Sequence, residues 1–161
     1  MGQPGHRRIR LTFVDSGESV VADLLDDEAP RTCDLVWGML PLQHDLYHGA
    51  FSGLEVFILL DEAPAVAPEQ RTHMPLPGEI LYWRDEATAV GENGVPVAEI
   101  LLAFGRGVRL GGPEGNPTTA NLFARIPGDW KHDWTEFAAA CKRVRKQGLT
   151  PLRIERVDDG G

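Results

Sequence analysis

The stretch Tyr47–Leu60, YHGAFSGLEVFILL, carries the pattern on which the fold prediction rests. In its second half the side chains at 54, 56, 58 and 60 are all apolar. They would share one face of a β-strand, because successive side chains of a strand point to opposite sides. A strand with one fully apolar face fits a sheet that covers a core on one side only. We therefore assign Glu55 and Phe57, which alternate with the apolar set, to the outer face of this sheet.

Six other segments have the short length and the apolar or alternating composition of strands. They are Arg8–Val14, Ser19–Leu25, Glu79–Trp83, Val97–Phe104, Leu122–Ile126 and Leu152–Val157. The turn sequence at 15–18 joins the first two into a hairpin. Three long segments, 61–77, 84–96 and 105–120, have no strand or helix pattern, and loops of this length are commonly functional.

Two segments have the spacing of amphipathic helices. The first begins at Pro30, which suits the first helical position, and ends before Pro41. The second runs from about Asp133 to Gln147, with Asp133 as the expected N-cap and Gly148 as the residue that closes the helix. Neither helix lies between two strands at the spacing of a β-α-β unit.

This order of elements predicts a mainly β fold. Seven short strands and two scattered helices favour a closed antiparallel β-barrel of about eight strands, with the two α-helices capping its ends. A chain of 161 residues is long enough to bury a core as one domain. We expect that domain to span 7–158, with flexible tails at 1–6 and 159–161.

Composition restricts the classes of partner. The formal net charge of −8 opposes binding to a phosphate backbone, so we expect no nucleic-acid partner. No apolar run approaches the roughly 20 residues that cross a bilayer, and we expect no membrane partner. The N-terminal sequence MGQPGHRRIR lacks the apolar segment of a secretory signal, which predicts a cytoplasmic location.

The histidines and cysteines do not form a recognisable metal site. His44 and His48 lie in HDLYH, which superficially resembles the zinc-binding pattern His-Glu-x-x-His. That pattern needs both imidazoles on one face of a helix, whereas this segment follows Pro41 and leads toward a strand. Cys33 and Cys141 fit no ligand spacing and fall on the apolar stripes of the expected helices. We therefore expect no metal and no cofactor.

A series of short motifs, in the correct order along the chain, resembles the cyclophilins. The motifs are VVADLLDDEAPRTCDLVWGMLP, YHGAFSGLEVF, PGEILYW, AEILLAFG, and NLFARI followed by a helix and TPLRIERV. The match is closer still to a group of uncharacterised prokaryotic cyclophilin-like proteins. Features typical of that group are His48 with Ser52-Gly53, the segment 75–79 before Tyr82, the segment 100–105, and Asn121-Leu122-Phe123. The resemblance covers about Arg8 to Val157 and implies a cyclophilin-like barrel of about eight strands.

The same resemblance argues against prolyl isomerase activity. In cyclophilins that activity depends on an arginine just after a Phe-His pair, and the matching position here is Gly49. Glycine has no side chain that could donate to the nitrogen of the twisted amide. The positions that complete the proline pocket are also replaced, by Leu54, Glu55 and Phe57. We therefore expect no ordinary peptidyl-prolyl isomerase activity.

The resemblance further implies that the outer face of the Leu54–Leu60 strand forms the floor of a groove. Our leading hypothesis is a small-molecule or peptide-like ligand in this groove, with Glu55 receiving a donor group and aromatic rings supplying apolar contact. If a reaction follows binding, His48 and Glu55 are the expected acid–base pair. The expected ligand-binding residues are Tyr47, His48, Ser52, Glu55, Phe57, Tyr82 and Asn121.

Several of these residues have a purely structural alternative. Glu55 could be a solvated residue on the wet face of a sheet. His48 and Ser52 could satisfy backbone groups near the start of the strand. Asn121 could fix the 105–120 segment through backbone hydrogen bonds.

The later strands leave a further alternative open. Tyr82 and Trp83 point to opposite faces, so one belongs to the core and the other is free to line the groove. Glu99 poses the same question on the following strand. For the whole protein, the alternatives to ligand binding are a degenerate prolyl isomerase and an interaction module that associates into a homo-oligomer.

Overall fold

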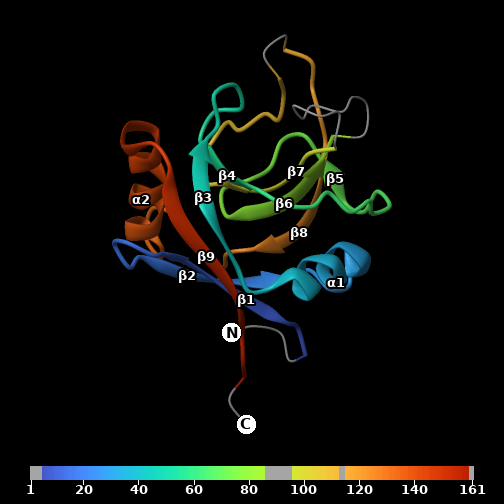
Figure 1. Cartoon of the computed structure of the whole chain (residues 1–161). Helices are drawn as coiled ribbons and strands as arrows, with labels where there is room; N and C mark the ends of the chain where they lie inside the picture. Colours follow the sequence, from blue (N-terminus) through green and yellow to red (C-terminus); the bar gives the residue numbers. More distant parts are fainter. Residues whose placement is uncertain (1–4, 86–95, 113–114, 160–161) are drawn as a thin grey trace.

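The structure, a computed structural model, describes residues 5–85, 96–112 and 115–159. In this part of the chain nine strands form one antiparallel sheet, and two helices pack against it (Figure 1). The elements are β1 (Arg8–Phe13), β2 (Ser19–Leu24), α1 (Pro30–Met39), β3 (Leu42–His48), β4 (Glu55–Leu59), β5 (Arg71–Thr72), β6 (Glu79–Arg84), β7 (Ala98–Ala103), β8 (Ala120–Arg125), α2 (Thr135–Gln147) and β9 (Thr150–Val157).

Eight of the strands close into a barrel. Their order is β2-β1-β9-β3-β4-β7-β6-β8, and β2 then pairs with β8, where Asp23 stands opposite Arg125 and Leu24 opposite Ala124. The short strand β5 adds to β8 outside this circle. The predicted fold class, a closed antiparallel barrel of about eight strands with two helices, is confirmed.

Both predicted helices are present, within a few residues of the expected limits. Gly148 ends α2 with a φ of 79°, a conformation that glycine adopts without strain. The expected N-cap was wrong, because Trp134 occupies that position and the Asp133 carboxylate instead accepts the backbone N–H of Asp129. The first turn of α1 is capped from a distant loop: the Glu69 carboxylate accepts the backbone N–H groups of residues 31 and 32.

The strand prediction missed β3 and β5. β3 reads LQHDLYH, and Leu46 is its only fully buried residue, so its apolar signal is weak. It forms because β9 and β4 pair with it on either side. β5 interrupts the long segment expected to be irregular at 61–77. Most of the expected loop at 84–96 lies outside the described residues, as do 1–4 and 160–161 of the expected tails.

Apolar side chains form two clusters, one on each side of the barrel wall. The larger fills the barrel interior and includes Val56 and Ile58 of β4, as the alternation predicted. The smaller lies on the outer face, where Val108 and Leu110 cover apolar side chains of β6, β7 and β8. Val108 and Leu110 therefore lie over the outside of the sheet, and β7 carries buried apolar side chains on both faces.

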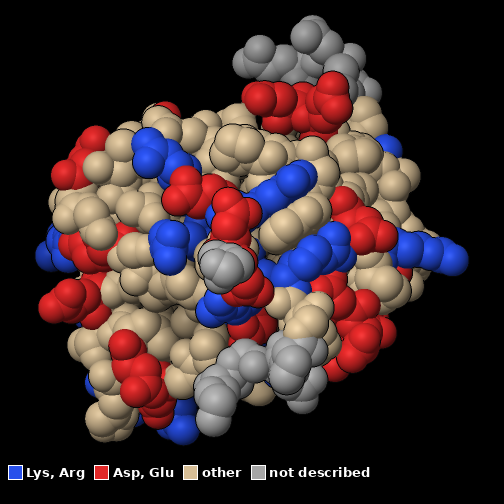
Figure 2. Space-filling view, turned by 90° about the horizontal axis from the view of Figure 1, so that it is seen from below, with Lys and Arg blue, Asp and Glu red and all other residues tan. Residues whose placement is uncertain are grey.

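The surface carries charges of both signs. Figure 2 shows Lys and Arg side chains interspersed with Asp and Glu over the face seen from below. Arg7 illustrates the pattern, because it contacts Asp26 at 2.6 Å and Asp34 at 2.8 Å. In the parts of the chain that the structure describes, neither helix has the length and apolar composition needed to span a membrane.

Candidate functional site

A cavity of about 490 Å³ opens on the outer face of the barrel, and we call it the outer groove. Its floor comes from β4, β6 and β7, and its rim from residues 47–52 and 110–112 together with Thr118. Strand register explains the floor: Tyr47 stands opposite Phe57, Phe57 opposite Leu101, and Glu99 opposite Trp83. Side chains at directly opposed positions lie on the same face of a sheet. The groove therefore collects side chains from four adjacent strands.

Glu55 is the buried acid of the outer groove. It is the first residue of β4, its exposed fraction is 5%, and its Oε2 has no hydrogen-bond partner among the described residues. Burial raises the pKa of this carboxyl to about 7, while the nearby Ser52 hydroxyl acts in the opposite direction. At neutral pH, Glu55 is therefore divided between its acid and its carboxylate forms.

Glu99 is a second acid on the same floor. It is half-buried on β7 and has no hydrogen bond or ion pair within the described ranges. Burial, and then the negative charge of Glu55, raise the pKa of Glu99 to about 8. No lysine or arginine is among the described residues that line the groove, so neither acid has a basic partner there.

Aromatic rings form the walls between these acids. Tyr47 and Phe57 stack with their ring centroids 5.4 Å apart and their planes 13° from parallel. Trp83 is held in place because its Nε1 donates to the Thr118 hydroxyl at 2.9 Å. The groove thus offers flat apolar surfaces beside two carboxyl groups, and a ligand could use both.

Gly49 makes the room that Glu55 occupies. A Cβ atom at position 49 would lie 2.6 Å from Cγ and 2.8 Å from Oε1 of Glu55. The backbone N–H of Gly49 also donates to the Glu55 carbonyl oxygen at 2.8 Å, which fixes the separation of the two residues. A side chain at position 49 and the present conformation of Glu55 therefore exclude one another.

Ser52 holds the rim over the floor. Its hydroxyl donates to the Gly111 carbonyl at 3.5 Å and accepts the Gly111 N–H at 3.4 Å. The backbone N–H of Arg109 donates to the Ser52 carbonyl at 3.1 Å. Ser52 lies on the groove wall, as expected, and it also has the structural role that was its alternative.

His48 faces away from the floor. It alternates with Tyr47 and so shares the side of β3 on which Leu46 enters the barrel interior. Its Nδ1 donates to the Gly49 carbonyl at 2.8 Å, its ring meets the Phe104 ring at 5.6 Å, and its buried Nε2 has no partner. No hydrogen bond joins His48 to Glu55 in the described part of the chain, and both residues line the groove. The negative charge of Glu55 acts on a second titratable group, Glu99.

Two expected site residues lie elsewhere. Tyr82 is 2% exposed inside the barrel and donates its hydroxyl to the Pro64 carbonyl, while Trp83 takes the place on the groove wall. Asn121 is also 2% exposed and does not line the groove. Its amide donates to the Thr32 hydroxyl and to the Ala67 carbonyl, both at 3.0 Å. Asn121 therefore links α1 to the loop that contains Ala67.

The two-histidine motif is not a metal site. Both residues lie on strand β3 rather than on a helix, and four positions along a strand separate Cα atoms by about 13 Å. His44 instead approaches Asp61, with 3.6 Å between Nε2 and Oδ2. No group of three or more metal-ligating side chains occurs among the residues that the structure describes.

Some of the groove residues that the prediction missed had a signal in the sequence, and others had none. Glu99 is the single charge in the strand AEILLA, and Trp83 was one of two alternatives, so both had a sequence signal. The rim at Leu110–Gly112 and Thr118 had none, because it belongs to a glycine-rich segment without periodicity.

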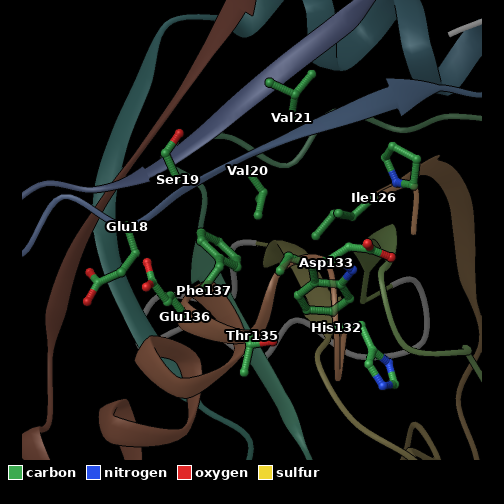
Figure 3. A pocket seen from close by; sticks show the side chains of 12 residues that line it. Glu18, Ser19, Val20, Val21, Ile126, His132, Asp133, Thr135, Glu136 and Phe137 are labelled. Carbon is green, nitrogen blue, oxygen red and sulfur yellow. The ribbon is translucent and has the colours of Figure 1, made fainter. Parts of the chain in front are cut away.

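A second cavity, of about 460 Å³, lies between the β1–β2 hairpin and the start of α2. Figure 3 shows Val20 and Ile126 pointing into it, with Glu18 and Asp133 at its borders. These two acids already have partners: Glu18 contacts Arg143 at 2.6 Å, and Asp133 accepts a backbone N–H at 2.6 Å. The outer groove, with its unpartnered acids, is the stronger candidate site.

A sequence model of the family described as "Protein of unknown function (DUF3830)" matches residues 11–155, and the chain belongs to this family. No curated protein matches the chain.

Solved structures show the same fold at low identity. McbB, in complex with tryptophan, aligns with a TM-score of 0.65 at 16% identity over 95% of this chain, which spans 46% of McbB. The hypothetical protein AF2241 from Archaeoglobus fulgidus aligns with a TM-score of 0.56 at 19% identity, over 98% of this chain and 100% of AF2241. At these identities the likeness concerns the fold alone.

Proposed function

We propose that this member of the DUF3830 family binds a small-molecule or peptide-like ligand in the outer groove, with Glu55 as the principal polar contact. One observation carries the proposal: a carboxyl that is 5% exposed, with an unpartnered oxygen, lies on the wall of a cavity of about 490 Å³. A buried polar group without a hydrogen bond costs roughly 1–3 kcal/mol, and a ligand N–H would remove that cost.

The walls favour a ligand with a flat apolar part. The stacked Tyr47 and Phe57 rings and the fixed Trp83 ring, which stands opposite Glu99, offer contact surface along the groove. McbB, which has a similar fold, is known in complex with tryptophan, a small molecule that combines an aromatic ring with N–H donors. Because the likeness concerns the fold alone, it serves to place aromatic amino acids among the ligands to be tested.

The proposal includes no ordinary prolyl isomerase activity. Gly49 stands where the resemblance to cyclophilins requires an arginine, and its missing side chain leaves the space that Glu55 fills. An arginine and this glutamate would compete for one volume, so the groove is adapted to an acid rather than to a guanidinium.

Thermal shift and calorimetry with amides, ureas, short peptides and aromatic amino acids test the proposal. We expect at least one class to raise the melting temperature of the wild type. We expect Glu55→Gln, which keeps one acceptor oxygen and replaces the other with an N–H donor, to reduce that shift. Glu79→Gln is the matched control, because Glu79 is equally buried but lies outside the groove. Ligands that bind Glu55→Gln as well as the wild type would remove the site assignment.

A further inference from the structure

We propose that the ligand of the outer groove is a diamine-like dication, with one protonated nitrogen at Glu55, the other at Glu99, and an apolar body between them. This inference rests on the proposed function and names the ligand class for the same site.

The register of β4 and β7 places the two acids at opposite ends of an apolar floor. Glu55 stands opposite Ala103, and Glu99 stands opposite Leu59, so the acids are offset by four positions along the strands. That offset, plus the spacing between neighbouring strands, separates their Cα atoms by about 14 Å. The directly opposed pair Phe57 and Leu101 lies between them.

Both ends of this floor lack a positive partner. Glu55 is buried with an unpartnered oxygen in the groove wall, which is independent evidence for a missing donor. Glu99 has no ion pair among the described residues, and the negative charge of Glu55 helps to raise its pKa. A single cation would satisfy one acid and leave the other unpaired, whereas a dication would satisfy both.

The middle of the groove suits a hydrocarbon or aryl spacer. Phe57 and Leu101 form the floor there, with Tyr47 stacked on Phe57 and Trp83 on the neighbouring strand. Aromatic faces also attract ammonium groups, so the rings would assist the charged ends. The protein's net charge of −8 favours the approach of a cation over that of an anion.

Such binding depends on pH. The described titratable groups that line the groove are Tyr47 and His48 of β3, Glu55 of β4 and Glu99 of β7, with none contributed by β6 or by the rim residues after position 48. A dication needs both acids ionised, so its affinity should rise between pH 6 and pH 8.5, with protons released on binding at pH 7.

Calorimetry with matched probes tests the inference. Pentane-1,5-diamine is compared with pentan-1-amine and pentane-1,5-diol, in two buffers of different ionisation enthalpy that report proton release. We expect the diamine to bind about tenfold or more tighter than the monoamine, because the second charge-assisted contact is missing in the monoamine. Glu55→Gln and Glu99→Gln should each remove most of this preference, and Glu79→Gln should retain it.

A series of diamines from three to eight carbons adds a geometric test. Affinity should peak at one length if two fixed carboxylates hold the ends, whereas simple apolar burial would raise it with every methylene. Equal affinity for diamine, monoamine and diol, or binding of amides and peptides alone, would overturn this inference and leave the proposed function standing. No binding by any probe of either panel would overturn both.

Discussion

Glu55 and Glu79 have the same exposed fraction, 5%, and each is the first residue of a strand, yet their surroundings differ completely. Glu79 stands opposite Arg125, whose Nη2 donates to Oε2 at 2.9 Å, and its Oε1 accepts the Leu76 N–H at 2.6 Å. Glu55 stands opposite Ala103 and has an oxygen without a partner.

The contrast separates burial from function. A buried carboxylate with an ion pair and a backbone donor is a structural element, because its neighbours replace the water that it lost. A buried carboxyl without such partners weakens the fold at neutral pH. A residue of the second kind is a candidate for a binding site, and under the proposed function the ligand would offset its cost. Three substitutions sharpen or break this distinction.

Glu55→Gln should have the largest effect and should stabilise the protein. The pKa of Glu55 is raised from 4.5 to about 7, so the folded state binds more protons than the unfolded state between these values, and the wild type loses stability as pH rises. Glutamine does not titrate, so the variant does not lose stability in this way as pH rises. Urea unfolding at pH 8.5 should show the variant more stable by up to about 3 kcal/mol, with little difference at pH 4.5. A difference that is the same at both pH values would contradict the assignment.

Glu79→Gln should have the opposite sign and a smaller size. The substitution replaces the charge that pairs with Arg125, which is half exposed, so the free energy of unfolding at pH 7 should fall by about 1–2 kcal/mol. The same urea experiment measures it. If Glu79→Gln stabilised the protein as Glu55→Gln is expected to do, the two acids would not be distinct.

Gly49→Ala should have the smallest effect on stability and a clear one on binding. Its Cβ would meet Glu55 Cγ at 2.6 Å, but the glutamate side chain can shift, so we expect a loss of about 1 kcal/mol. Groove ligands should bind more weakly because Glu55 is displaced. Gly112→Ala, at another groove position, meets nothing within 4 Å and serves as the control. If Gly49→Ala and Gly112→Ala bound groove ligands equally well, Gly49 would have no particular role in the site.

Much of the fold was visible in the sequence because strand alternation and helix spacing are local. The outward direction of Glu55 and Phe57 followed from alternation and is correct. The choice between Tyr82 and Trp83 could not be made, because β6 has apolar side chains on both faces and nothing local shows that Val108 and Leu110 cover the outer one.

Long-range partners account for the other differences. Asn121 donates a hydrogen bond to Thr32, 89 positions earlier in the chain, and no local sequence pattern predicts that contact. Glu69 is similar, because its partners on α1 lie 37 and 38 positions away. Whether an acid is paired or unpaired depends on such contacts, so burial patterns alone could not distinguish Glu55 from Glu79.

The pairing of β1 with β9 has a practical consequence. Arg8, the first residue of β1, stands directly opposite Val157, the last residue of β9. Figure 1 shows that β9 ends on the far side of the barrel from the loop that follows β3. A surface tether attached beyond either residue would therefore lie at the opposite end of the barrel from residues 49–52 of the groove rim. A short peptide bridge between these two positions would give a circular protein whose barrel is unchanged.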